Sequence, residues 1–140
     1  MFDLTGKTAL VTGASGGIGH DIASALHAQG ATVGLSGTRA EALESLRAAL
    51  GDRAHVLPCN LGDAASVDAL PKQAEAAMGG VDVLVNNAGV TRDNLLIRMK
   101  EEEWDKVLDV NLKGAFLFMK AASRSLMRSM LSALVTGIDI

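Results

Sequence analysis

The chain contains no tyrosine, and its 140 residues include only one cysteine, one tryptophan and two prolines. The single cysteine, Cys59, excludes an intrachain disulfide and fits a reducing cytoplasm. No apolar run reaches the roughly 18 residues that a membrane-spanning helix needs, and the first residues lack the basic and apolar segments of a secretory signal. We therefore expect a cytoplasmic protein without a membrane partner.

Positive charge is also scarce, since 13 Lys and Arg stand against 16 Asp and Glu and give a net charge of −3. A polyanion binder needs a basic surface, so nucleic acid is not an expected partner. Metal ligands are few as well. His20 and His27 would lie about 10 Å apart along a shared helix, which is too far for one ion, and zinc would lack a cysteine pair. We expect no metal site.

What the sequence does contain is an alternation of short apolar runs with segments of helical periodicity. The apolar runs predict strands at 8–11, 31–35, 55–58 and 81–85, and the periodic segments predict helices at 18–30, 40–50, 63–80 and 101–131. Pro71 should kink or divide the third helix, and a bend is expected near Asn111 or Gly114 in the fourth. The tail 134–140 is typical of another strand. This alternation predicts a single α/β domain over residues 1–140, with a mainly parallel sheet covered by helices on both faces.

The first predicted strand leads into a glycine cluster, Thr12-Gly-Ala-Ser-Gly-Gly-Ile-Gly19. Ligands of doubly wound sheets bind at the carboxyl ends of the strands, so this turn is a candidate site. Gly13, Gly17 and Gly19 would let the backbone approach a phosphate, which the free N–H groups at the start of the next helix attract. The same glycines could serve close packing of strand and helix instead. The strand before them and the helix after them favour phosphate binding.

The end of the second strand favours the dinucleotide that carries an additional phosphate. NAD binding places an acid about 20 residues after the glycines, but Ser36-Gly-Thr-Arg39 stands there, and the first acid after this stretch is Glu41. Thr38 and Arg39 would hold a 2′-phosphate, because a guanidinium suits phosphate geometry. The alternative is that Arg39 is a solvated residue that opens the second helix.

Asparagines follow the remaining strands. Asn60 and Leu61 come after the third strand and could flank an adenine ring, whereas Asn86 and Asn87 come after the fourth, where their amides could also simply fix neighbouring loops. Asn111 lies within a predicted helix, where asparagine is unfavourable unless its amide has a partner or a function.

Together these motifs resemble the short-chain dehydrogenase/reductase family: the glycine cluster at 12–19, Asn86-Asn-Ala-Gly89, and Asn111 within Val110-Asn-Leu-Lys-Gly114. The resemblance runs from Leu4 to about Met127, and the segment 90–104 is similar to that of bacterial 3-oxoacyl-[acyl-carrier-protein] reductases. It implies a three-layer Rossmann-type fold, incomplete here, with strand order 3-2-1-4 plus the tail strand. It also implies NADPH-dependent reduction of a 3-oxoacyl thioester in fatty acid synthesis.

The resemblance further implies which residues form the site. Gly13, Ala14, Ser15, Gly16, Ile18 and Gly19 would line the pyrophosphate and ribose of NADP(H), Thr38 and Arg39 would meet the adenosine phosphate, Asn60 and Leu61 would contact adenine, and Asn87, Ala88 and Gly89 would pass beneath the ribose. Asn111 would be the catalytic asparagine, which orders a water in a proton relay. Gly16 departs from the basic residue that many NADP-dependent members carry.

The lack of tyrosine is the larger departure. In the family a Tyr-x-x-x-Lys pair supplies the general acid that protonates the carbonyl oxygen, and this chain has no such pair. We therefore expect a shortened or internally deleted reductase that keeps a partial NADP(H) site and is inactive alone. The alternative is a non-catalytic NADP(H)-binding module or a truncated subunit. The apolar stripe along 104–130 is expected to mediate homo-oligomerisation.

Overall fold

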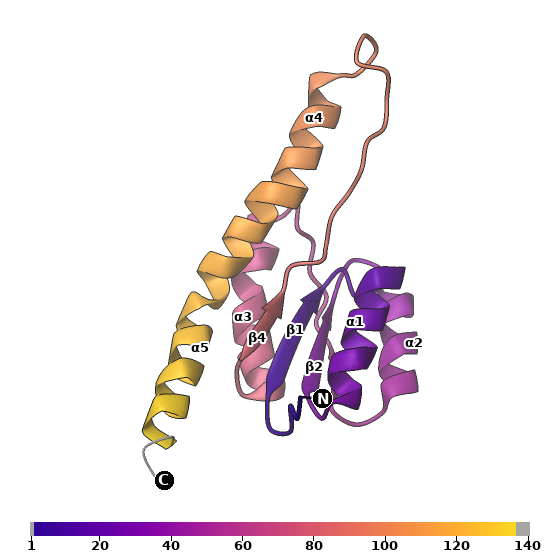
Figure 1. Cartoon of the computed structure of the whole chain (residues 1–140). Coiled ribbons are helices and arrows are strands. Elements are labelled where there is room, and N and C mark those ends of the chain that lie inside the picture. The colour runs from indigo at the N-terminus through magenta and orange to yellow at the C-terminus, as the bar shows by residue number, and fades with distance from the viewer. Residues whose placement is uncertain (1, 137–140) are drawn as a thin grey trace.

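The computed structural model describes the backbone of residues 2–136 and the side chains up to Leu131 (Figure 1). Its elements alternate as the sequence predicts. The strands are β1 (Thr8–Thr12), β2 (Thr32–Ser36), β3 (Ala54–Val56) and β4 (Val83–Val85). The helices are α1 (Gly17–Ala28), α2 (Ala40–Leu50), α3 (Ala64–Met78), α4 (Glu101–Leu108) and α5 (Gly114–Thr136), with a π-helical turn η1 (Asp109–Lys113) between the last two.

The strands form one parallel sheet in the order β3-β2-β1-β4. Val11 of β1 pairs with Leu35 of β2 on one side and with Val85 of β4 on the other. The predicted order 3-2-1-4 is confirmed. The predicted tail strand is wrong over Leu134 to Thr136, because α5 continues through these residues, and no glycine or proline interrupts the sequence between 115 and 136. The rest of that prediction, residues 137–140, lies outside the described residues.

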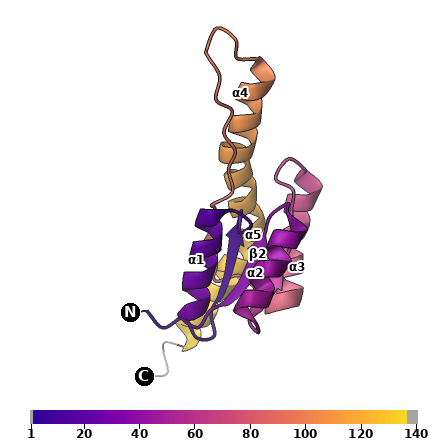
Figure 2. The ribbon, with the colours of Figure 1, turned by 90° about the vertical axis from the view of Figure 1, so that its right-hand side faces the viewer.

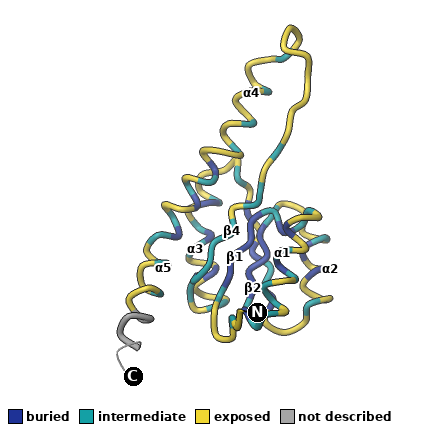
Figure 3. The backbone as a smooth tube through the Cα atoms, viewed as in Figure 1, coloured by how far each residue is buried: buried dark blue, intermediate teal, exposed yellow. Residues whose placement is uncertain are grey.

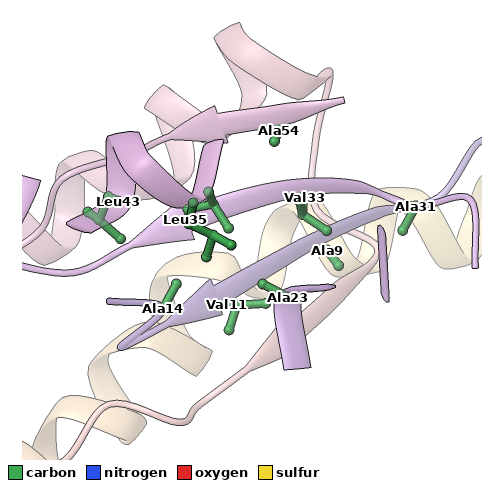
Figure 4. Close-up of a cluster of buried hydrophobic side chains, with 10 residues drawn as sticks. Ala9, Val11, Ala14, Ala23, Ala31, Val33, Leu35, Leu43 and Ala54 are labelled. Atoms are coloured by element: carbon green, nitrogen blue, oxygen red, sulfur yellow. The ribbon is translucent and has the colours of Figure 1, made fainter. Parts of the chain in front are cut away.

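Helices cover both faces of the sheet (Figures 1 and 2). Side chains of a strand alternate between faces, so Val11 packs with Leu43 on the side of α1 and α2, where Figure 4 shows the cluster. Leu10 instead packs with Leu70 of α3 and Phe118 of α5. The buried residues follow the strands and the inner sides of the helices (Figure 3). Each fully buried Leu or Phe stabilises the fold by about 1.5–3 kcal/mol.

Local signals set several helix ends. The carboxylate of Asp63 accepts a hydrogen bond from the N–H of Ala65 at 3.0 Å and caps α3. Gly51 after α2 and Gly79 after α3 have φ of 79° and 82°, which disfavour other residues. The predicted division of the third helix is wrong, because Pro71 lies inside a continuous α3. Buried side chains of α3 on both sides of this proline hold the helix against the sheet.

The segment after β4 and helix α4 form an arm that extends beyond the carboxyl ends of the strands (Figures 1 and 2). The tip of this arm carries Leu95, Leu96 and Ile97, which are exposed. The π-helical turn η1 stands where the sequence predicts a bend, and it contains Asn111. Within residues 2–136 the structure contains no helix whose length and apolar character would let it span a membrane.

At the opposite end of the sheet, Asp82 ties β1, β4 and α5 together. Its carboxylate accepts hydrogen bonds from the Thr8 N–H at 2.7 Å, from the Thr8 hydroxyl at 3.0 Å and from the Ser129 hydroxyl. Burial alone would raise the pKa of Asp82, but these hydrogen bonds, with the charge of Lys7, lower it below its usual value. The ionised carboxylate thus anchors the amino-terminal edge of the sheet and leaves the carboxyl-terminal edge to the site.

Candidate functional site

A cavity of about 610 Å³ lies at the carboxyl ends of the strands. It is bounded by the glycine turn after β1, the ends of β2, β3 and β4, and one side of α4, η1 and α5. All the cofactor-binding residues predicted from the sequence line it, with the exception of Ala14, namely Gly13, Ser15, Gly16, Ile18, Gly19, Thr38, Arg39, Asn60, Leu61, Asn87, Ala88 and Gly89. Ala14 is buried in the core beneath the turn, and Asn111 does not line the cavity.

Two of the three predicted glycines serve close packing within the protein. Gly13 has a φ of +66°, and a Cβ there would lie 2.8 Å from the Cα of Ala88. A Cβ on Gly19 would lie 2.6 Å from Nδ2 of Asn87 and closer still to the carbonyl oxygen of Gly13. These glycines let the turn after β1, the first turn of α1 and the end of β4 come together. The packing alternative therefore holds for Gly13 and Gly19.

Gly17 differs from both, because a Cβ there would have no protein atom within 4 Å. It is the first residue of α1 and lines the cavity. Its N-cap residue, Gly16, has extended backbone, and within the described chain α1 has no side-chain cap and no acid in its first turn. The free N–H groups and positive dipole end of α1 are thus open to an anion in the cavity.

The buried Thr12 hydroxyl joins the ends of β1 and β4. Its Oγ1 accepts hydrogen bonds from the backbone N–H groups of Asn87 and Ala88, both at 3.1 Å, and donates to the carbonyl oxygen of Val85 at 3.1 Å. The side-chain amide of Asn87 donates in turn to the carbonyl oxygens of Thr12 at 3.0 Å and Gly13 at 3.2 Å. Thr12 is a structural residue of the site that the sequence analysis did not single out, although it begins the glycine cluster.

Arg39 lines the cavity beside the glycine turn. It is the N-cap residue of α2, and its guanidinium donates to the carbonyl oxygen of Ser15. Both of the alternatives considered for this residue are therefore compatible with its position: it opens α2, and it lines the cavity together with Thr38. A guanidinium has five N–H donors, so the bond to Ser15 leaves others for a ligand.

Asn111 uses its amide to hold the segment after β4. Its Oδ1 accepts from the Val90 N–H at 2.8 Å, and its Nδ2 donates to the Val90 carbonyl oxygen at 2.9 Å. This pair of hydrogen bonds gives the helical asparagine the partner that its position requires. A Cβ on Gly89 would lie 3.1 Å from Oδ1 of Asn111, so a larger residue there would require the Asn111 side chain to shift slightly.

Sequence reasoning missed several residues of the cavity wall. Cys59 lies two positions before Leu61 at the end of β3, is buried, and accepts a hydrogen bond from the Ser66 hydroxyl at 3.5 Å. Burial raises the pKa of the Cys59 thiol. The position of Cys59 after a strand was the available signal. The remaining unpredicted lining residues are Thr12, Ser36, Gly37, Gly62, Val90, Arg92, Lys106, Val110 and Phe118.

Among the residues that the structure describes, no three His, Cys, Asp or Glu side chains come together as a metal site would require. The fold is an incomplete Rossmann-type α/β fold, and the cavity lies where such folds bind their ligands. A family model described as "short chain dehydrogenase" matches residues 7–136. The chain belongs to the short-chain dehydrogenase family.

Curated relatives share the same segment. Nodulation protein G of Rhizobium sp. (strain N33) is 56% identical over 128 residues, which are 91% of this chain and 52% of that protein. The 3-oxoacyl-[acyl-carrier-protein] reductase FabG of Escherichia coli (strain K12) is 44% identical over 131 residues, 94% of this chain and 54% of the relative. That of Rickettsia felis is 46% identical over 129 residues, 92% of this chain and 52% of the relative. The chain thus spans about half the length of the curated relatives it matches.

Replacing Thr12 with valine keeps the shape of the side chain and removes the hydroxyl. We expect the free energy of unfolding to fall by about 2–3 kcal/mol, because two N–H groups and one carbonyl oxygen near the sheet edge lose their partner. Urea unfolding followed by circular dichroism measures this change. Thr32→Val, at the start of β2, is the matched control and should change stability by less than about 0.5 kcal/mol. Equal effects of the two substitutions would contradict the role of Thr12.

The contrast between Gly17 and Gly19 gives a second prediction. Gly19→Ala should destabilise the fold by about 1–3 kcal/mol, because its Cβ overlaps Asn87 and Gly13. Gly17→Ala should leave stability unchanged or raise it by up to about 1 kcal/mol, because its Cβ enters open space. The same Cβ occupies the space at the start of α1 and should weaken the binding of an anion there by about tenfold or more. Thermal unfolding and calorimetric titration with NADPH separate the two effects; unchanged NADPH affinity in Gly17→Ala would contradict an anion site there.

Proposed function

We propose that the chain forms the dinucleotide-binding half of an NADPH-dependent 3-oxoacyl-[acyl-carrier-protein] reductase, and that alone it is an NADP(H)-binding module. The observation that carries this proposal is one cavity that is lined by the glycine turn, Thr38, Arg39, Asn60 and Asn87 together. The names of the relatives in Escherichia coli and Rickettsia felis supply the reaction and the substrate class.

The residues present fit a dinucleotide. Gly17 leaves room beside the uncapped start of α1 for the pyrophosphate, and Thr38 and Arg39 lie where a 2′-phosphate would follow β2. In the order of the sheet, Asn60 and Leu61 stand at the end of β3 for the adenine. The lining segment 87–89 after β4 takes the remaining ribose. When bound, NADPH supplies the hydride that converts a 3-oxo group to a 3-hydroxy group.

Reduction of the carbonyl also requires a proton for its oxygen. Of the described residues that line the cavity, none is Asp, Glu, His or Tyr. Burial holds the Cys59 thiol protonated, but Cys59 lies after β3, on the side of β2 assigned to adenine. We propose that Asn111 acts in the proton relay only as a positioning residue. Its amide is bonded to the backbone of Val90.

The preference for NADPH depends on Arg39. Replacing it with alanine should weaken NADPH binding by about 1.5–3 kcal/mol, the value of a charged hydrogen bond, and should leave NADH binding nearly unchanged. Fluorescence titration of both dinucleotides checks this, with Arg47→Ala on the outer side of α2 as the control because Arg47 does not line the cavity. Equal affinity of the wild type for NADPH and NADH, or stronger binding of NADH, would overturn the assignment of Arg39.

The chain alone should not catalyse the reaction at a measurable rate. General acid catalysis contributes about 10²–10⁴-fold, and the chain has no tyrosine to supply it. The assay follows NADPH oxidation with an acetoacetyl thioester, and the Escherichia coli reductase is the positive control. Turnover at the rate of that control, by protein of confirmed 14.5 kDa mass, would contradict the proposal of a binding module.

We propose that the chain associates through an exposed apolar stripe, defined as Trp104, Leu108, Leu112, Phe116 and Met119, which are 40–69% exposed. Contiguous exposed apolar surface of this kind favours association. The double substitution Leu112→Glu and Phe116→Glu should convert the associated form to a monomer in sedimentation velocity experiments. Leu96→Glu, at the tip of the arm and away from the stripe, is the control that should stay associated. A monomeric wild type at tens of micromolar would contradict this proposal.

A further inference from the structure

The walls of the cavity carry charge of one sign. Among its described lining residues, three are cations, Arg39, Arg92 and Lys106. None of the described lining residues is an acid. The chain as a whole has the opposite bias, with 16 acidic and 13 basic residues. None of the three cations takes part in an ion pair within the part of the chain that the structure describes. A cavity of this kind attracts negatively charged ligands.

The three cations stand on two different walls. Arg39 follows β2, whereas Arg92 lies in the segment that follows β4. Because β1 lies between β2 and β4 in the sheet, the two arginines flank the glycine turn from opposite sides. Lys106 of α4 stands one helical turn before Val110, which also lines the cavity, and belongs with Arg92 to the wall built by the arm.

The charges around Arg92 leave its guanidinium available. Its one hydrogen bond among the described residues joins Nη1 to the carbonyl oxygen of Thr91 at 2.7 Å. One acid near Arg92 is Glu103, whose carboxylate already accepts from the Lys100 N–H at 2.8 Å and from Nδ2 of Asn94 at 3.2 Å. These hydrogen bonds are the main cause of the lowered pKa of Glu103, with a smaller contribution from the charge of Arg92. Arg92 and Lys106 are both exposed and can turn toward a ligand.

The dinucleotide does not account for this second wall. Its pyrophosphate belongs at the start of α1 and its 2′-phosphate at Arg39, on the far side of β1 from the arm. Two cations remain, on the wall of the cavity that the arm builds. Resting on the proposed function, we infer that Arg92 and Lys106 bind the phosphate of the pantetheine arm that carries the 3-oxoacyl thioester. The phosphate ester is common to an acyl carrier protein and to coenzyme A, and either source would meet the same two side chains.

The experiment compares two ligands that differ only in this phosphate. We would titrate the full chain, saturated with NADPH, with 4′-phosphopantetheine and with pantetheine by calorimetry. The wild type should prefer the phosphorylated ligand by about tenfold or more, as expected for charged hydrogen bonds to two cations. Arg92→Ala and Lys106→Ala should each reduce this preference, and the double variant should abolish it while binding pantetheine as the wild type does.

Matched variants separate recognition from general charge. Arg98 lies in the same segment as Arg92, and Lys120 lies on α5; both are exposed and neither lines the cavity. The variants Arg98→Ala and Lys120→Ala should therefore keep the preference for the phosphorylated ligand. Arg39→Ala should weaken NADPH and keep the preference as well. Titration with coenzyme A and with a holo acyl carrier protein then identifies the source, since the carrier recognised by this wall should lose affinity in the double variant.

The outcomes distinguish this inference from the proposed function. Equal affinity for pantetheine and 4′-phosphopantetheine, no detectable binding of either, or equal weakening of both in the variants would overturn the role of Arg92 and Lys106. If NADPH still binds in that case, the proposed dinucleotide site stands. The chain could instead show a phosphate preference that depends on both side chains and yet not bind NADPH when titrated with the dinucleotide alone. That result would overturn the proposed function and support the role of Arg92 and Lys106.

Discussion

The site depends on one close contact, in which the backbone at the end of β1 meets the backbone at the end of β4. Gly13 and Gly19 have no room for a Cβ because Ala88 and Asn87 stand against them. The Thr12 hydroxyl and the Asn87 amide supply the hydrogen bonds that hold the two strand ends at this distance. These hydrogen bonds give the polar groups that the contact buries the partners that burial requires.

This contact sets the direction of the chain after β1 and after β4. It fixes where α1 begins, so that the uncapped N–H groups of the helix face the cavity and Gly17 leaves space in front of them. It also directs the chain after β4 away from the sheet toward Val90, where Asn111 bonds both backbone groups. The turn after β1 and the segment after β4, which are distant in sequence, thereby form opposite walls of one cavity. The side chains on each wall determine which ligand binds.

The sequence predicts those features that short-range chemistry determines. Asp63 caps α3 and Gly51 ends α2 because each signal acts within a few residues, and strand order follows from the family motifs. The predicted division of α3 at Pro71 was wrong because burial on both sides of the proline outweighs one missing hydrogen bond. Arg92 and Lys106 were missed because only the folded chain brings the ends of different elements to one cavity, whereas Cys59 was missed although its position after a strand was a signal. The glycine cluster does follow β1, as predicted. Which of its glycines pack closely and which face open space depends on the segment after β4, which the sequence alone does not place beside it.

The π-helical turn η1 links the cavity to the exposed stripe. Lys106, Val110 and Phe118 line the cavity at intervals that are multiples of four residues, with the buried Gly114 between them. In a regular α-helix each step of four residues overshoots a full turn by about 40°, so three steps would rotate a side chain about 120° out of line. A π-helical turn, with its wider i→i+5 hydrogen bonds, takes up one additional residue and reduces that drift. The same reduced drift keeps the exposed stripe, with Trp104, Leu108, Leu112 and Phe116, on another side of the continuous helix that α4, η1 and α5 form. Packing of a partner on that stripe would therefore restrain the rotation of α4, and with it the position of Lys106 in the cavity wall.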